Sequence, residues 1–273
     1  MKECVLIAMT LAAFIANDAC AQVPTLPAGA KTHWVVDQTE EVVVYVLFDP
    51  ATVADRLPPN LRFITIGELA TDGVRWAEEH LTEEPSHSPW GISFLEVVRM
   101  GTFMIDGHAP DWPQDGAIAL WAARVAPSDS TTSSYPGRPL LVLEFWLPDN
   151  QYVAYMRDKG HYATYGDVKL RQDPDGKWLG SIRIDGLSVV AECAPTGPVT
   201  GGAGSSGMQT FFPPNLSAVT SFVTAAFAGH QIQTCTEDSS WKLEGTHALA
   251  RGVPLGPSTF QFGYRLVGGA FHP

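Results

Sequence analysis

The sequence predicts a mainly β fold of the α+β class, an antiparallel barrel or sandwich with a few packed helices. Many short β-branched and aromatic runs, two Asp-Gly hairpin signals between such runs, and few helical patterns support this prediction. At 273 residues, 45% hydrophobic and 17% charged, the chain is long and apolar enough to bury a core as a single domain.

The first strong element is the strand Glu41–Phe48, EVVVYVLF. Asp49 and Pro50 then predict a capped short helix over Ala51–Leu57. Further strands are predicted at Phe63–Ile66, Ile92–Met104, Ala117–Val125, Leu140–Leu147, Val168–Arg171, Trp178–Ile184, Leu187–Glu192 and Trp241–Leu249.

Two longer helices are predicted. One is Asp149–Lys159, closed by Gly160, and the other is Asn215–Ala228, which has an asparagine cap and an apolar stripe. Ser128–Gly137 and Pro195–Met208 are rich in small polar residues and glycine, and we expect both to be long loops.

The N-terminus is typical of a secretory signal peptide. Lys2 precedes the apolar run Val5–Ile15, and Ala19-Cys20-Ala21 forms an A-x-A exit, so cleavage is expected before Gln22. We therefore expect a signal peptide over residues 1–21, a single domain over residues 22–273, and an exported, periplasmic or secreted, protein. No later segment has the roughly 20 apolar residues of a membrane span.

Removal of the signal leaves two cysteines, Cys193 and Cys235. In an exported chain they predict one disulfide, and two buried free thiols are the alternative.

The net charge of -12 disfavours nucleic acid, because phosphate binding needs clustered basic residues. The eight histidines show no paired metal spacing, and the glycine-rich Gly202–Gly207 lacks the strand and helix of a dinucleotide site, so we expect no metal and no cofactor. His80 and His87 flank an acidic loop and are expected at the surface. A small-molecule ligand remains the expected partner, and a homo-oligomer is compatible with the sequence.

Four charged residues stand in strand-like surroundings. Glu96 and Glu144 each lie among apolar neighbours and either face solvent or need a partner, because burying an unpaired carboxylate is costly. Lys169 and Arg171 alternate with Val168 and Leu170, but alternation does not say which face is interior. On an interior face the amine of Lys169 would lose hydration, its pKa would fall, and it could form a Schiff base. The alternative is an exposed hairpin lysine.

Three separated segments resemble the acetoacetate decarboxylase superfamily, in the right order and over most of the mature chain. They are Val44–Leu61, with its L-P-P-x-L ending, Leu147–Leu170, which runs from an Asp-Asn pair to Lys169, and Trp241–Phe271, with a proline-containing turn before a closing strand.

This resemblance implies a closed antiparallel β-barrel or cone of acetoacetate decarboxylase type, with a Schiff-base lysine inside. It places Lys169 at the nucleophile, although Val168 stands where proline is usual and Leu170 where a second lysine is expected. The implied function is a lyase that decarboxylates a β-keto or related oxo acid. Glu96 would orient substrate or move protons, and Arg171 would favour the neutral amine. The alternative is a non-catalytic barrel that binds a small ligand.

Overall fold

The computed structural model describes residues 31–37, 40–59, 61–105, 117–129, 139–158, 161–201, 206–212, 223–228, 231–236, 239–262 and 265–270. The predicted signal peptide and the predicted helix-closing Gly160 lie outside these residues.

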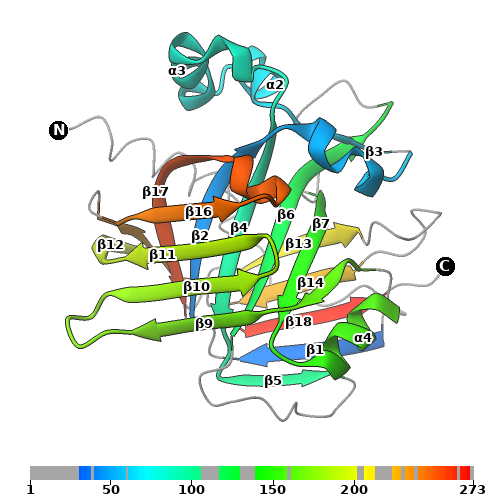
Figure 1. Ribbon diagram of the computed structural model, residues 1–273, viewed down its shortest axis with the longest axis vertical. Coiled ribbons are helices and arrows are strands. Elements are labelled where there is room, and N and C mark those ends of the chain that lie inside the picture. Colours follow the sequence, from blue (N-terminus) through cyan, green and yellow to red (C-terminus); the bar gives the residue numbers. More distant parts are fainter. Residues whose placement is uncertain are drawn as a thin grey trace.

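Most described residues belong to two β-sheets, which confirms the mainly β class. The large sheet has 14 strands, twelve of them in one continuous order (Figure 1). That order is β12 (Pro195–Gly201), β15 (Gln231–Cys235), β17 (Val253–Phe262), β2 (Glu40–Phe48), β4 (Gly91–Arg99), β6 (Ala117–Pro127), β7 (Pro139–Leu147), β13 (Ser206–Phe212), β14 (Val223–Ala228), β18 (Arg265–Ala270), β1 (Lys31–Asp37) and β5 (Thr102–Ile105). The short strands β3 (Leu61–Phe63) and β8 (Ala163–Tyr165) pair with β6 and β7.

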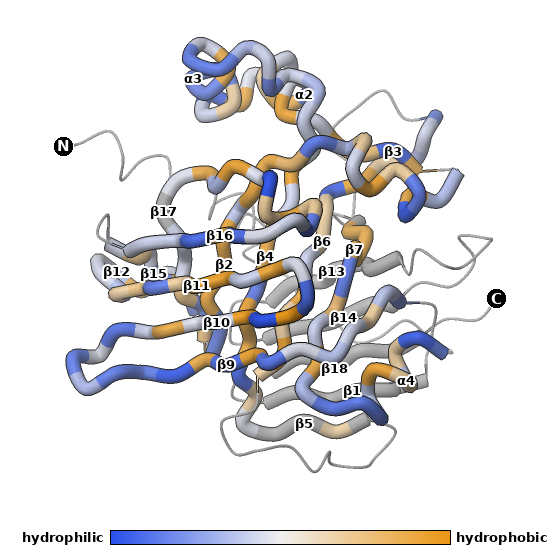
Figure 2. Tube along the Cα trace, in the orientation of Figure 1, coloured by the Kyte–Doolittle hydropathy of each residue, from blue (hydrophilic) through white to orange (hydrophobic). Residues whose placement is uncertain are grey.

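The small sheet lies across the central strands of the large one (Figure 1). Its strands are, in order, β16 (Trp241–Gly245), β11 (Leu187–Cys193), β10 (Trp178–Ile184) and β9 (Asp167–Gln172). The two predicted Asp-Gly hairpins join β9 to β10 and β10 to β11, and their glycines, Gly176 and Gly186, have φ of 84° and 74°. The hydrophilic tip of the first hairpin projects beyond the apolar central strands (Figure 2).

Helical segments are short. The 3-10 helices are η1 (Pro50–Arg56), η2 (Pro85–His87) and η3 (Ala248–Arg251), and the α-helices are α2 (Ile66–Thr71), α3 (Arg75–Glu83) and α4 (Asn150–Asp158). Asp49 caps η1 as predicted, through its carboxylate and the amide of Ala51. The sequence prediction missed α2 and α3, although Thr65 and Glu68 form a capping box at the start of α2.

The central strands are buried on both faces, which explains why β2 is a continuous apolar run. Val42, Val44 and Val46 face a core shared with the small sheet, here called the small-sheet core. Val43 and Tyr45 face the opposite way, into a core that also contains residues of α2, α3 and α4, here called the helix-side core.

The predicted closed barrel is wrong, because no sheet closes within the described part of the chain. The large sheet ends at β12 and β5, which do not pair with one another. β12 is exposed, has an irregular register, and contains Pro195 and Pro198, which lack the amide hydrogen that a continuing ladder needs. The sheet folds back instead: β5 follows β4 after Met100 and Gly101, yet pairs with β1 at the far end of the order (Figure 1).

Several predictions of local structure are also wrong. The predicted strands Phe63–Ile66 and Trp241–Leu249 stop at Phe63 and Gly245, before α2 and η3, and the predicted strand Ile92–Met104 is divided into β4 and β5. Residues 223–228 of the predicted helix Asn215–Ala228 form β14, and residues 213–222 lie outside the described residues. The predicted loop Pro195–Met208 contains β12 and the start of β13, with residues 202–205 outside the described part. The apolar run over residues 223–228 is short enough to form either a helix or a strand. Its pairing with β13 and β18 makes it the strand β14.

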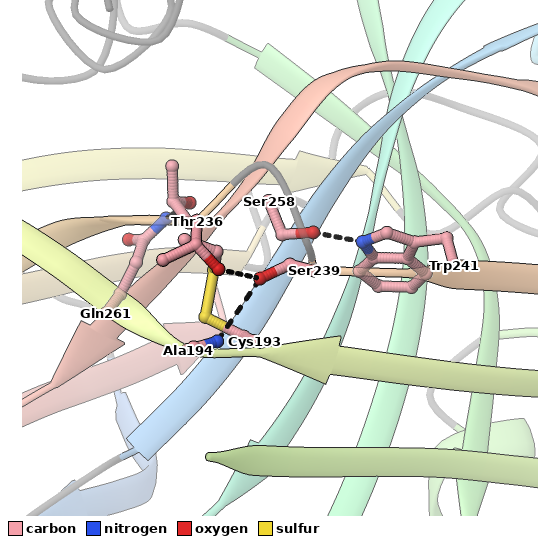
Figure 3. Close-up of a disulfide and its surroundings, with 9 residues drawn as sticks. Cys193, Ala194, Thr236, Ser239, Trp241, Ser258 and Gln261 are labelled. Atoms are coloured by element: carbon pink, nitrogen blue, oxygen red, sulfur yellow. Dashed lines mark hydrogen bonds between the residues drawn. A yellow bond between two sulfur atoms is a disulfide. The ribbon is translucent and has the colours of Figure 1, made fainter. Parts of the chain in front are cut away.

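Cys193 and Cys235 form the predicted disulfide, with an S–S distance of 1.99 Å. It joins the end of β11 to the end of β15, and therefore ties the small sheet to the large one. Beside it the hydroxyl of Ser239 accepts a hydrogen bond from the amide of Ala194 at 3.2 Å (Figure 3).

Candidate functional site

Lys169 lies on the outer face of the small sheet, so the expectation of an interior amine is wrong. In β9, Val168 and Leu170 are buried in the small-sheet core, while Asp167, Lys169 and Arg171 are exposed. The Nζ of Lys169 is 2.9 Å from Asp167 Oδ1, and about half of each side chain is exposed. A Schiff-base amine needs a desolvated setting, and these contacts do not supply one.

Glu96 lies away from Lys169, on the face of β4 that points into the helix-side core. Its register partner is Val43, and Glu41 lies two positions along β2 on the same face. Burial, followed by the charge of Glu41, raises the pKa of Glu96 well above its ordinary value near 4.5. Thr259 and Gln261 of β17 share this face and are buried. The structure therefore does not bring the three predicted catalytic residues together.

A different carboxylate, Glu144, is the centre of the most complete polar cluster in the described residues. Its Oε1 accepts hydrogen bonds from Trp146 Nε1 at 3.2 Å and Thr164 Oγ1 at 3.0 Å. Its Oε2 accepts from Arg56 Nη1 at 3.1 Å and lies 3.0 Å from His247 Nε2. We call this cluster the Glu144 site.

A β-bulge places Glu144 there. Trp121 of β6 pairs with Glu144, but the next residue, Ala122, pairs with Val142, so Leu143 is an extra residue in β7. The bulge reverses the alternation, and Glu144 and Trp146 face the small-sheet side rather than the side of Val142.

His247 is held in one orientation. Its Nδ1 accepts a hydrogen bond from the amide of Leu249 at 3.2 Å, which caps η3. The proton is therefore assigned to Nε2, which donates to Glu144. Trp121 and Trp146 approach the imidazole edge-on, each with a ring-centre distance of 5.9 Å. Both ring nitrogens are engaged, so His247 positions Glu144 and does not act as a free base.

Arg56 supplies the positive charge of the site from the last turn of η1. Its Nη1 also donates to the carbonyl of Leu143 at 2.9 Å, and its guanidinium lies 4.9 Å from the ring centre of Tyr162. Its side chain is 20% exposed, against 8% for Glu144, so the arginine is the part of the pair that solutes can reach.

Glu144 is held ionised. Burial alone raises its pKa, but the hydrogen bond from His247, then the charge of Arg56 and the hydroxyl of Thr164, outweigh burial, and the pKa is lowered from its ordinary value near 4.5. With four donors around it, the carboxylate anchors its neighbours and has little capacity left to accept a proton from a ligand.

Other side chains singled out in the sequence have simpler settings. His80 of α3 and His87 of η2, expected at the surface, are half-buried and contact each other, with 3.0 Å between His80 Nε2 and His87 Nδ1. Within the described ranges, no group of three or more His, Cys, Asp or Glu side chains is arranged to hold a metal. No described helix is long and apolar enough to cross a membrane.

No protein-family model and no curated protein matches this chain. Comparison with solved structures shows that it has the acetoacetate decarboxylase-like fold, which confirms the resemblance seen in the sequence. An acetoacetate decarboxylase-like enzyme from Sphingomonas wittichii RW1 is 14% identical with a TM-score of 0.50, over 91% of this chain and 97% of that one. The enduracididine biosynthesis enzyme MppR, complexed with pyruvate, is 14% identical with a TM-score of 0.48, over 94% and 91% of the two chains.

The sequence pointed to Glu144 as well as Glu96 as strand carboxylates in need of a partner, but not to Arg56 or His247. Arg56 lies in the L-P-P-x-L segment and His247 in the W-K-L-E-G-T-H segment, and both segments had carried the family resemblance. What was missing was the bulge that turns Glu144 towards them.

Proposed function

We propose that the protein holds a small organic acid at the Glu144 site without forming a covalent bond to it. The fold is that of enzymes, and the resemblance in sequence implies an oxo-acid ligand, but the chemistry that the family motif implies for Lys169 has no support in its surroundings. The proposal is therefore a binding function, or a lysine-independent reaction at the same place.

One observation carries the proposal: the cation at the site is an arginine. The lysines whose side chains the structure describes all form ion pairs on the small sheet, Lys169 with Asp167, Lys177 with Glu192 and Lys242 with Glu244. A guanidinium stays protonated and does not add to a carbonyl as a neutral amine does. The guanidinium can orient an anion, and the other residues of the Glu144 site hold it in place.

The test is direct binding. We expect isothermal titration calorimetry to show saturable binding of at least one member of a panel of short 2-oxo and 3-oxo acids. We expect Glu144→Gln to weaken that binding, because it removes the anchor of Arg56, and Lys169→Ala to leave it unchanged. A panel without any binder, or a binder lost in Lys169→Ala, would overturn the proposal.

We propose in addition that the chain is exported after cleavage before Gln22. The A-x-A exit and the disulfide support this, since disulfides persist in oxidising compartments. The check is the intact mass of protein recovered from the periplasm or medium of an expressing cell. Recovery only inside the cell, with residues 1–21 still attached, would contradict it.

A further inference from the structure

Arg56 uses only part of its hydrogen-bonding capacity. A guanidinium has five N–H donors, and Nη1 supplies the two contacts to Leu143 and Glu144. The remaining donors are on Nε and Nη2, and neither makes a hydrogen bond to any residue that the structure describes. These two nitrogens point their hydrogens along the same edge of the guanidinium, which is one of the two edges that bind a carboxylate with two parallel hydrogen bonds.

The guanidinium is also fixed in orientation, and the Arg56 side chain is partly exposed. Nη1 is held by two acceptors, and the ring of Tyr162 covers one face at 4.9 Å, so the guanidinium plane has little freedom to turn. A fifth of the side chain is exposed. An arginine fixed before binding loses less conformational entropy when an anion arrives.

We propose that the Nε–Nη2 edge of Arg56 is the recognition point for the carboxylate of a monoanionic ligand. This inference rests on the proposed function and names the ligand class of the same site. The two parallel N–H donors of this edge match the two oxygens of a planar carboxylate. Glu144 already carries a negative charge next to Arg56, so a doubly charged phosphate meets stronger repulsion there than a single carboxylate does.

The test compares two probes that differ in charge and little in shape, acetoacetate and its neutral amide, acetoacetamide. We expect acetoacetate to bind at least about tenfold more tightly, the scale of a charge-assisted hydrogen bond. In nitrogen-resolved NMR, the Nε–H signal of Arg56 moves with acetoacetate and stays with acetoacetamide. The Nε–H signal of Arg171, on the outer face of the small sheet, moves with neither.

Variants extend the test. Arg56→Lys keeps the positive charge but removes the pair of parallel N–H donors. We expect this variant to bind acetoacetate about tenfold more weakly, with little change in its affinity for acetoacetamide. Arg56→Gln leaves Glu144 without its cation and can fail to fold, so the double variant Arg56→Gln, Glu144→Gln is the second probe. It keeps the site neutral, and we expect it to lose the preference for the acid over the amide.

The outcomes separate this inference from the proposed function. Equal affinity for acid and amide in the parent protein, or an unmoved Arg56 Nε–H signal, would overturn the carboxylate edge while leaving a small-ligand site intact. Absence of binding by both probes and by the whole oxo-acid panel would overturn the proposed function itself.

Discussion

Arg56 Nη1 donates a hydrogen bond to Glu144 Oε2 over 3.1 Å, although the two residues are 88 positions apart in the chain. The contact joins η1 to the bulge of β7, and Thr164 and His247 bring β8 and η3 to the same carboxylate. Four separated segments of the fold therefore depend on one ionised side chain.

Replacing Glu144 by glutamine should destabilise the protein by about 2–4 kcal/mol, because Arg56 is left largely buried without its counter-ion. Chemical unfolding at pH 7 measures this free energy. The control is Glu192→Gln, which removes a more exposed ion pair with Lys177 and should cost under about 1 kcal/mol. Equal losses in the two variants would show that the Glu144 site contributes no more to stability than a surface ion pair.

Glu96 gives the fold a pH dependence on the alkaline side. Its folded-state pKa is raised, so the folded protein binds its proton more tightly than the unfolded chain does. Its contribution to stability is complete below about pH 4.5, the ordinary pKa of the group. This contribution is lost as the pH rises from there through the raised pKa of the folded state. Each unit by which folding raises the pKa of Glu96 corresponds to about 1.4 kcal/mol of stability that is lost at high pH.

Glu96→Gln should remove that loss, since the amide stays neutral at every pH. Unfolding free energies at pH 5 and pH 8 should differ less in this variant than in the parent. Glu144→Gln, which removes a carboxyl with a lowered pKa, should not flatten the alkaline side. A parent protein equally stable at both pH values would contradict the raised pKa.

The orientation of β9 predicts a large loss of stability at one residue and a small loss at its neighbour. Leu170→Ala removes a fully buried side chain and should cost about 2–5 kcal/mol. Lys169→Ala removes a half-exposed one and should cost under about 1 kcal/mol. Thermal or denaturant unfolding of the two variants gives the comparison, and a larger loss for Lys169 would place the lysine inside.

The disulfide closes a loop of 42 residues and should contribute about 3–4 kcal/mol, chiefly by restricting the unfolded chain. Replacing both Cys193 and Cys235 by alanine should lower the unfolding free energy by this amount. Reductant should weaken the parent and leave the double variant unchanged. Insensitivity of the parent to reductant under unfolding conditions would contradict the bond.

The sequence was sufficient where a local signal is strong. The apolar run of β2, the cap of η1 by Asp49 and the glycine turns of the small sheet are set by neighbouring residues, and all were predicted. The capping box at Thr65 was equally local and was overlooked.

The features that could not be predicted depend on contacts between residues far apart in the sequence. Alternation in β9 grouped Lys169 with Arg171 correctly, but only packing against the large sheet shows that Val168 and Leu170 are the buried pair. Sheet closure depended on whether two distant edges meet. The Glu144 site depended on one extra residue in β7, and strict alternation cannot show such a bulge.

Reductive trapping tests the central claim most directly. The protein is incubated with acetoacetate or pyruvate and borohydride, and its intact mass is measured alongside calorimetric binding of the same acid. We expect an unchanged mass together with saturable binding that Arg56→Lys weakens. A stoichiometric mass increase that maps to a lysine would show a Schiff base and contradict it.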